Sequence, residues 1–385
     1  MKTIRKILSY VLVAALASAI SFGIAGQSRM PVAVPGKLMQ LENLIRERFI
    51  GEVDVVSMED AAARAMVDSL GDQWSHYLSA AEFADYKEQM NNAYVGIGIT
   101  ILAEEGEAGF EIIRVEPNGP AKEAGLQMGD ILTGAEDISF SGMTSSEAAV
   151  IIKGEEGTAV RVNVLRNGEP MEFTVERRNI QVQVAKGEMV TADTGLVTIV
   201  NFDARCAGET LAAIESVLDQ GAEKIIFDVR NNPGGYKDEL VEILDFLLPE
   251  GPLFRSESYT GKVIVDESDS ACLDIPMAVL VNENSYSAAE FFAAALSEYD
   301  AAVVVGTQTT GKGYYQNTFE LKDGSAVGLS VGKYSTPNGV NLAGVGITPD
   351  VVVEVDEDTF AKIYNHLLPI AEDPQVAAAL EALDQ

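Results

Sequence analysis

The feature that most constrains the fold is an alternation of short apolar runs and helical patterns between residues 194 and 305. The runs have the length of buried strands, and the segments between them carry apolar residues three and four apart, as on one face of a helix. This alternation predicts an α/β core built from βαβ crossovers. The expected strands are 194–200, 224–229, 276–281 and 302–305, and the expected helices are 208–218, 239–248 and 288–296.

Two segments with other patterns precede this core. Residues 31–93 carry apolar side chains at helical spacing, and Ser79 stands where it can cap the last of these helices. Residues 94–178 carry short β-branched runs between glycines, with a helix over 145–152 and a hairpin across Arg166-Asn167-Gly168. We therefore expect a multidomain α/β protein. Its core spans residues 179–370 and contains a last helix over about 358–368, and an acidic tail over 371–385 follows the core.

Residues 1–30 stand apart from the rest. Lys2, Arg5 and Lys6 precede an apolar run of about 18 residues, which is typical of an export signal and just long enough to span a bilayer. The positive end stays inside, so the body is exported. We favour an uncleaved anchor with a single N-terminal span. Cleavage within Ala17–Ala19 remains the alternative and would give a secreted protein.

Composition limits the partners. The chain has 27 basic and 59 acidic residues among 385, a formal net charge of −32. Such a field repels nucleic acid, so we expect no nucleic-acid partner for the folded body. The simpler interpretation of the acidity is a solubility feature spread over the surface. Cys206 and Cys272 are the only cysteines; they make no metal cluster, we expect no metal or other cofactor, and their pairing stays open.

Three segments of the core stand out as candidates for chemistry. The first is Asp228–Gly235, whose Asn, Pro and Gly residues by themselves indicate an ordinary turn after a strand. Its consecutive glycines, Gly234 and Gly235, also expose backbone N–H groups that can bind a developing oxyanion. Both interpretations stay open for this segment alone.

The second segment, Asn282–Glu290, joins an apolar strand to an Ala-rich helix. Ser287 and Glu290 fit the S-x-x-E capping box, and capping is the simpler interpretation of the pair. A serine at a strand-to-helix turn is also well placed as a nucleophile. The amide of Ala288 would then lie at the helix N-terminus, where the dipole favours negative charge.

The third segment, Gly306–Gly313, nearly matches the P-loop pattern G-x-x-x-x-G-K-[ST]. Gly313 stands where a P-loop needs its magnesium-binding hydroxyl, and residues 314–321 predict a strand where a P-loop needs a helix. We therefore interpret Lys312 as a buried general base. That role needs a pKa lowered from about 10.4 to about 7–8, which desolvation can supply.

Gln316 is expected to orient this lysine, because residues 312, 314 and 316 share one face of a strand. A Ser–His–Asp arrangement fits poorly. His76 lies in the N-terminal helical region and His366 in the last helix, and neither stands in a glycine-rich turn. Because neither histidine is placed to act as the general base, a lysine can take that role.

The three segments together resemble motifs of the S41 carboxyl-terminal-processing peptidases, and the resemblance covers residues 37–370. Ser287 and Lys312 are 25 residues apart, which is similar to the family spacing. The matching segments are 228–235 for D-L-R-N-N-P-G-G, 285–290 for S-A-S-A-S-E, and 309–316 for T-F-G-K-G-x-x-Q, with Val229, Tyr286, Ala289 and Thr310 as departures.

Residues 94–178 resemble a PDZ domain, since 120–132 fit the signature P-A-x-x-A-G-[IL]-x-x-G-D-x-[IL]. Lys153 matches a basic residue that in relatives helps couple the PDZ domain to the catalytic site. Residues 70–78 resemble L-D-P-H-S-x-Y-L, with Gln73 and Trp74 in place of Pro and His. The expected carboxylate-binding loop, whose amides hold a peptide C-terminus, consists of Val95, Gly96, Ile97, Gly98 and Ile99.

The resemblance implies a serine endopeptidase with a protease core of the type shared by ClpP and crotonases. Ser287 would be the nucleophile and Lys312 the base, while Ala288 and Gly234 or Gly235 would bind the oxyanion. Substrates would be exported proteins with a free, apolar C-terminus, and the site would lie outside the bacterial cell membrane. A non-catalytic PDZ-bearing adaptor is the alternative, and a homodimer stays open.

Overall fold

The computed structural model describes residues 34–103 and 109–384, and the chain divides into two compact units, Met1–Met66 and Val67–Gln385. Helix α2 (Val34–Arg48) lies in the first unit, and helix α3 (Val55–Asp68) begins there. The expected export signal or anchor over 1–30 lies outside the described residues. Among the described helices, none combines the length and the apolar character that a bilayer crossing requires.

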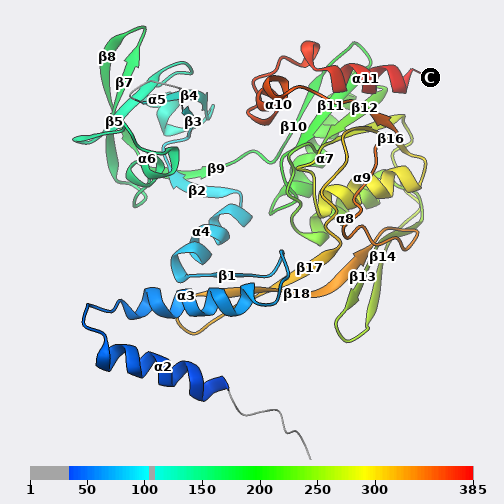
Figure 1. Ribbon diagram of the computed structural model, residues 1–385. Helices are drawn as coiled ribbons and strands as arrows, with labels where there is room; N and C mark the ends of the chain where they lie inside the picture. The colour runs from blue at the N-terminus through cyan, green and yellow to red at the C-terminus, as the bar shows by residue number, and fades with distance from the viewer. Residues whose placement is uncertain (1–33, 104–108, 385) are drawn as a thin grey trace, which may run out of the picture. The chain divides into compact units, whose positions relative to one another are not determined.

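A six-stranded sheet forms the core of the second unit (Figure 1). Its order is β10-β11-β12-β15-β16-β19, in which β10 is antiparallel to β11 and all other pairs are parallel. The predicted α/β core is therefore confirmed. Its elements are β10 (Ala185–Met189), β11 (Thr194–Ile199), α7 (Cys206–Asp219), β12 (Lys224–Asp228), α8 (Lys237–Leu247), β15 (Met277–Val281), α9 (Ala288–Glu298), β16 (Ala302–Gly306) and β19 (Val351–Val352).

The sheet is covered on both faces, because successive residues of a strand point to opposite sides. In β12, Ile225 and Phe227 pack into a core that includes residues of α7, α8 and α9. Ile226, between them, packs into a second core on the other face. Strands buried on both faces have continuous apolar runs, which is why these strands stood out in the sequence.

The second face is covered by helix α11 (Pro374–Leu383), so the expectation of an acidic tail over 371–385 is wrong. Val376 and Ala379 are buried against the sheet, where apolar spacing of three and four residues gives the helix one apolar face. Asp373 caps α11 and forms a 2.8 Å ion pair with the buried Arg230. The helix expected near 358–368 is α10 (Glu357–Tyr364), followed by the short 3₁₀ helix η1 (Ile370–Glu372).

The β-rich region contains a sheet of order β3-β4-β5-β7-β8, with β6 beside β5. The predicted hairpin turns through Asn167 and Gly168, whose φ values of 53° and 83° suit a tight two-residue turn. Strands β2 and β9 pair with each other and connect this region to the core. The elements are β2 (Ala93–Gly96), β3 (Ile99–Ala103), β4 (Phe110–Val115), α5 (Pro120–Ala124), β5 (Ile131–Ala135), β6 (Ile138–Ser139), α6 (Ser145–Ile152), β7 (Ala159–Arg166), β8 (Glu169–Glu176) and β9 (Arg178–Gln181).

A further sheet, of order β1-β18-β13-β14 with β17 beside β18, brings distant segments together. Only the strand near residues 314–321 was expected from the sequence. Strand β1 pairs with β18, and helix α4 (Ala80–Met90) follows it with Ser79 as N-cap, as predicted. The elements are β1 (His76–Leu78), β13 (Gly251–Ser258), β14 (Val263–Ser268), β17 (Tyr314–Glu320) and β18 (Ala326–Ser335).

Phe292 offers a test of the core. Its side chain is fully buried and contacts Phe202 and Phe227, with ring centroids 5.8 and 5.3 Å away. We expect Phe292→Ala to lower the free energy of unfolding by about 3–5 kcal/mol, because it leaves a cavity. Phe319→Ala, at a site 45% exposed, should change it by only about 0.5 kcal/mol. Urea unfolding followed by circular dichroism measures both; equal effects would contradict the packing described.

Candidate active site

Ser287 lies at a sharp turn between β15 and α9. Its φ and ψ are 58° and −124°, a conformation that a side chain other than glycine adopts only at an energetic cost. The turn is held by Ser285, whose Oγ donates to the carbonyl oxygen of Val229 at 2.7 Å. A strained serine between a strand and a helix is the arrangement in which a nucleophile is presented at the edge of a sheet.

Capping does not exclude another role for the Ser287 hydroxyl. The carboxylate of Glu290 accepts the N–H of Ser287 at 3.0 Å, and the pair has the arrangement of a capping box. The amide of Glu290 also donates to the Ser287 carbonyl oxygen at 2.9 Å. A hydroxyl that faces an amide as acceptor keeps its own proton, so it can still donate that proton elsewhere.

Glu290 connects the two segments that carry the candidate nucleophile and base. Its carboxylate is fully buried. Oε2 accepts the N–H groups of Ser287 and Lys312 at 3.0 and 2.9 Å. Oε1 accepts the N–H of Gly311 at 2.7 Å and the hydroxyl of Thr309 at 2.5 Å. Hydrogen bonds to a charged acceptor are stronger than neutral ones, so this side chain fixes the spacing of the two segments.

Lys312 is partly buried beside aromatic rings. Its Nζ lies 4.8 Å from the ring centroid of Trp74 and 5.8 Å from that of Tyr286, and these rings are 6.0 Å apart. Burial lowers the pKa of Lys312, while the charges of Glu290 and Asp72 oppose that shift. No carboxylate of the described residues lies within ion-pair distance of Nζ, and no hydrogen bond joins Nζ to Ser287 Oγ.

No hydrogen bond joins Gln316 to Lys312, the residue that it is expected to orient. Its Nε2 donates to Ser330 Oγ at 3.0 Å and to the carbonyl oxygen of Tyr314 at 3.3 Å. Lys312 precedes β17, which begins at Tyr314, so strand alternation does not apply to the lysine. The pairing of β17 with β18 is also irregular between Tyr315 and Gln316. Gln316 nonetheless lines the same cavity as Lys312.

The expected oxyanion donors lie around Ser287. Ala288 is the first residue of α9, and a Cβ added at Gly234 would lie only 2.7 Å from Ser287 Cβ and 2.8 Å from Ala288 N. Only glycine permits this approach, since Gly234 also has a φ of 86°. Its N–H, however, donates to Asn232 Oδ1 at 2.8 Å, which leaves Ala288 and Gly235 as the available donors.

These residues line one cavity of about 1020 Å³. Ser287, Lys312, Gly234 and Gly235 lie on its wall together with several aromatic rings. His76 also lies there, contrary to its separation in the sequence, and its Nδ1 is 3.1 Å from the carbonyl oxygen of Trp74. The aromatic lining residues are Trp74, Phe83, Tyr86, Tyr236, Tyr286, Phe319 and Tyr334.

The expected carboxylate-binding loop, residues 95–99, lies where β2 ends and β3 begins. Val95 and Gly96 belong to β2 and pair with β9, so Ile97 and Gly98 form the turn into β3. Gly98 has a φ of 80°, and Ile97 is buried. Within the described residues, the N–H groups of Ile97 and Gly98 donate to no backbone group. β3 is an edge strand that packs near α6, so one of its edges has no partner strand among the described residues.

Lys153 is the C-cap residue of α6 and is exposed. The expected coupling role concerns the relation between the β-rich region and the core. That role therefore stays a prediction.

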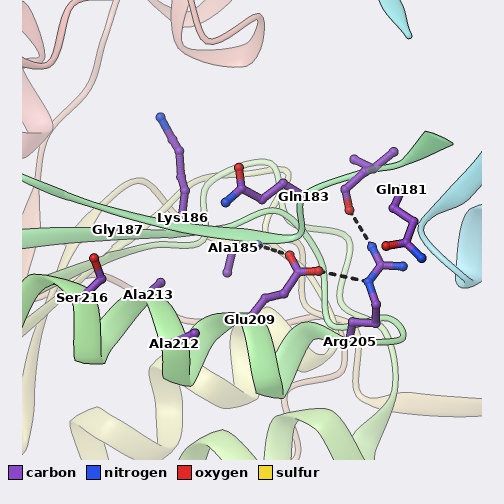
Figure 2. A pocket seen from close by; sticks show the side chains of 11 residues that line it. Gln181, Gln183, Ala185, Lys186, Gly187, Arg205, Glu209, Ala212, Ala213 and Ser216 are labelled. Carbon is purple, nitrogen blue, oxygen red and sulfur yellow. Dashed lines mark hydrogen bonds and ion pairs between the residues drawn. The ribbon is translucent and has the colours of Figure 1, made fainter. Parts of the chain in front are cut away.

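A separate pocket of about 430 Å³ lies between β10 and α7 (Figure 2). Its two charged groups at the helix end are engaged with each other and with the backbone. Arg205 Nε donates to Glu209 Oε1 at 3.0 Å, and its Nη2 donates to the carbonyl oxygen of Val182 at 2.6 Å. Glu209 Oε2 accepts the N–H groups of Val184 and Ala185. The pocket does not contain the candidate nucleophile or base.

Several residues of the site were missed by the sequence analysis. Glu290 fits a capping box so well that its four hydrogen bonds had no separate signal. Asn232 is fully buried and holds the Gly234 amide, although its side chain stands in a turn-like segment. Trp74 and Tyr286, two departures from the family motifs, contact each other beside Lys312. The sequence indicated these two residues only through the fact that both positions differ from the family motifs.

Two family profiles match this chain. Peptidase family S41 matches residues 193–353, and the PDZ domain matches residues 95–176. The first of these ranges contains Ser287 and Lys312, and the second contains the Ile97–Gly98 turn.

Two relatives and a solved structure agree with these profiles. The chain is 31% identical over 337 residues to a "Probable CtpA-like serine protease" of Staphylococcus aureus strain MSSA476, covering 86% of this chain and 67% of the relative. It is also 31% identical over 324 residues to the protein of that name in Staphylococcus saprophyticus, covering 83% and 65%. A crystal structure from Bacteroides fragilis, named for the S41 proteases, shares the fold with a TM-score of 0.62 and 17% identity, covering 90% of this chain and 97% of that one. The chain therefore belongs to peptidase family S41, a family of serine proteases, and carries a PDZ domain.

Proposed function

We propose that this protein is an endopeptidase in which Ser287 is the nucleophile and Lys312 the general base. The observation that carries the proposal is that a strained serine and a partly buried lysine line one cavity and are held by the same buried carboxylate, Glu290. A buried lysine loses its proton more easily, which is what a general base requires near neutral pH.

The reaction follows from this arrangement. Neutral Lys312 takes the proton of Ser287 Oγ, which attacks the carbonyl carbon of a peptide bond. The amides of Ala288 and Gly235 stabilise the oxyanion. Lys312 then donates the proton to the leaving amine, and water hydrolyses the acyl-enzyme in the reverse order. Lys312 Nζ has to move from the rings of Trp74 and Tyr286 to the serine, and Gln316 stands on the cavity wall where it can orient the amine after that movement.

The PDZ domain is proposed to select the substrate. A free C-terminal carboxylate would bind the amides of Ile97 and Gly98, while the preceding residues pair with the free edge of β3. The apolar surroundings of that edge, with Ile99 and Ile101 packed on the PDZ core, favour an apolar C-terminus. Lys153 is proposed to couple this binding to the catalytic region.

The N-terminal segment completes the proposal. Lys2, Arg5 and Lys6 followed by an apolar run support an export signal that is retained as an anchor in the bacterial cell membrane. The protease would then act on exported proteins outside the cytoplasm.

Replacement of either member of the pair tests the mechanism. We expect Ser287→Ala and Lys312→Ala each to lower kcat/KM on an unstructured protein by about a thousandfold or more, because they act in the same step. Lys322→Ala, which removes an exposed lysine, is the matched control and should retain activity. Binding of the substrate without cleavage by the unmodified protein would favour the adaptor alternative.

Substrate ends test the PDZ proposal. A substrate with an apolar C-terminus should be cleaved about tenfold faster than the same substrate ending in a carboxamide, because the amide removes the charge held by the loop. A short peptide with a free apolar end should inhibit, and its amidated copy should not. Equal cleavage of both substrates would contradict C-terminal recognition.

The pH profile tests the role of Lys312. Because the base must be neutral, kcat/KM should rise with pH and reach its plateau below the ordinary lysine pKa of 10.5. Asp72 raises the pKa of Lys312, so Asp72→Asn should shift the rise to lower pH. Asp219→Asn, which removes an exposed charge on α7, should leave the profile in place. A shift of the Asp72→Asn profile to higher pH would contradict this assignment.

A further inference from the structure

Asp203 is a buried acidic residue on the wall of the catalytic cavity that the proposed mechanism does not use. Its exposed fraction is 7%, and Oδ1 is buried without a hydrogen-bond partner among the described residues. A buried polar atom without a partner is destabilising, and such atoms are rare in folded proteins. A hydrogen-bond donor from outside the described residues would stabilise this oxygen atom.

The chain places Asp203 next to the candidate oxyanion loop. A Cβ added at Gly235 would lie 2.7 Å from Asp203 N, and one added at Gly234 would lie 2.7 Å from Ser287 Cβ. Neighbouring Cα atoms are about 3.8 Å apart, so Asp203 and Ser287 flank the same pair of glycines. Phe202 fixes this contact, since its N–H donates to the Gly234 carbonyl oxygen and its own carbonyl oxygen accepts the N–H of Tyr236.

No cation of the described residues neutralises Asp203. It forms no ion pair within 4.0 Å, and Lys87, which lines the same cavity, lies over the ring of Phe83 instead. The nearby charge is that of Glu239, which repels it. Burial, with a smaller contribution from Glu239, raises the pKa of Asp203 to about 7. An approaching cation would favour the charged carboxylate.

The surroundings fit a long basic side chain. Tyr86 and Tyr236 line the same cavity as Asp203, and the N–H of Tyr236 donates to the carbonyl oxygen of Phe202, the residue before Asp203. Aromatic rings accept the methylene stem of lysine or arginine and attract its charged head. A carboxylate in the specificity pocket of a serine protease can select basic side chains.

We propose that Asp203 is a specificity-determining residue that receives the lysine or arginine side chain of a substrate residue near the scissile bond. The inference rests on the proposed function, because it assumes that Ser287 cleaves a peptide in this cavity. It adds a second criterion to the C-terminal one: the PDZ domain selects the end of the substrate, and Asp203 selects where the chain is cut.

Matched peptides test this proposal with the full-length protein. Internally quenched peptides share one apolar C-terminus and carry a single lysine, or norleucine in its place, at each position around the cleavage site. We expect the lysine peptide to exceed its norleucine partner in kcat/KM by about tenfold or more at one position. In Asp203→Asn this ratio should fall towards one. The ratio is independent of the amount of folded enzyme, so partial misfolding does not affect it.

Two controls separate the alternatives. Asp219→Asn removes the same charge from an exposed site on α7, and it should keep the ratio of the unmodified protein if Asp203 acts locally. A ratio that falls equally in Asp219→Asn would assign the preference to the net charge of −32 and overturn the proposal. Ser287-dependent cleavage with a ratio near one would overturn this inference alone. No Ser287-dependent cleavage of any peptide would overturn the proposed function and the inference with it.

Discussion

The buried carboxylate of Glu290 is the interaction on which the candidate site depends. It accepts the backbone N–H groups of Ser287 and Lys312, residues that the sequence separates by a helix and a strand. A buried charge is stable only when hydrogen bonds replace its water, and four donors do so here. The same bonds occupy the Ser287 amide while leaving its hydroxyl for chemistry.

The parallel sheet supplies the positions that Glu290 connects. The turns after β12, β15 and β16 lie at the carboxyl ends of neighbouring strands, where α/β folds place their ligands. The turn after β12 contributes the glycines, the turn after β15 the serine, and the segment after β16 the lysine. Hydrogen bonds made by the side chains of Asn232 and Ser285 hold the first two turns. Arg230, in the first turn, forms an ion pair with Asp373, which connects α11 to the same network.

Aromatic side chains set the chemistry of the cavity around these turns. Trp74 and Tyr286 lie beside Lys312 and limit its access to water, which lowers its pKa. Their rings also attract the ammonium, so they favour the charged form of Lys312 that burial disfavours. On the other side of the glycine pair, Asp203 lines the cavity with Tyr86 and Tyr236 and forms no ion pair with a cation of the described residues. One wall therefore carries the proposed catalytic pair, and the other carries the acidic residue that we propose recognises a substrate side chain.

The sequence by itself determined the α/β core and the β-rich domain, because the periods of strands and helices are local properties. It also supplied the candidate site residues Ser287, Lys312 and the two glycines, because turn residues are recognisable locally. It could not determine the bonds of Glu290, the partners of Gln316 or the burial of Asp203, since each depends on segments that meet only when the sheets form. The irregular β17–β18 pairing, the Asn232 bond to Gly234 and the packing of α11 were likewise decided by tertiary contacts. Local patterns specify which elements form, whereas hydrogen-bond partners and desolvation are fixed by what packs against them.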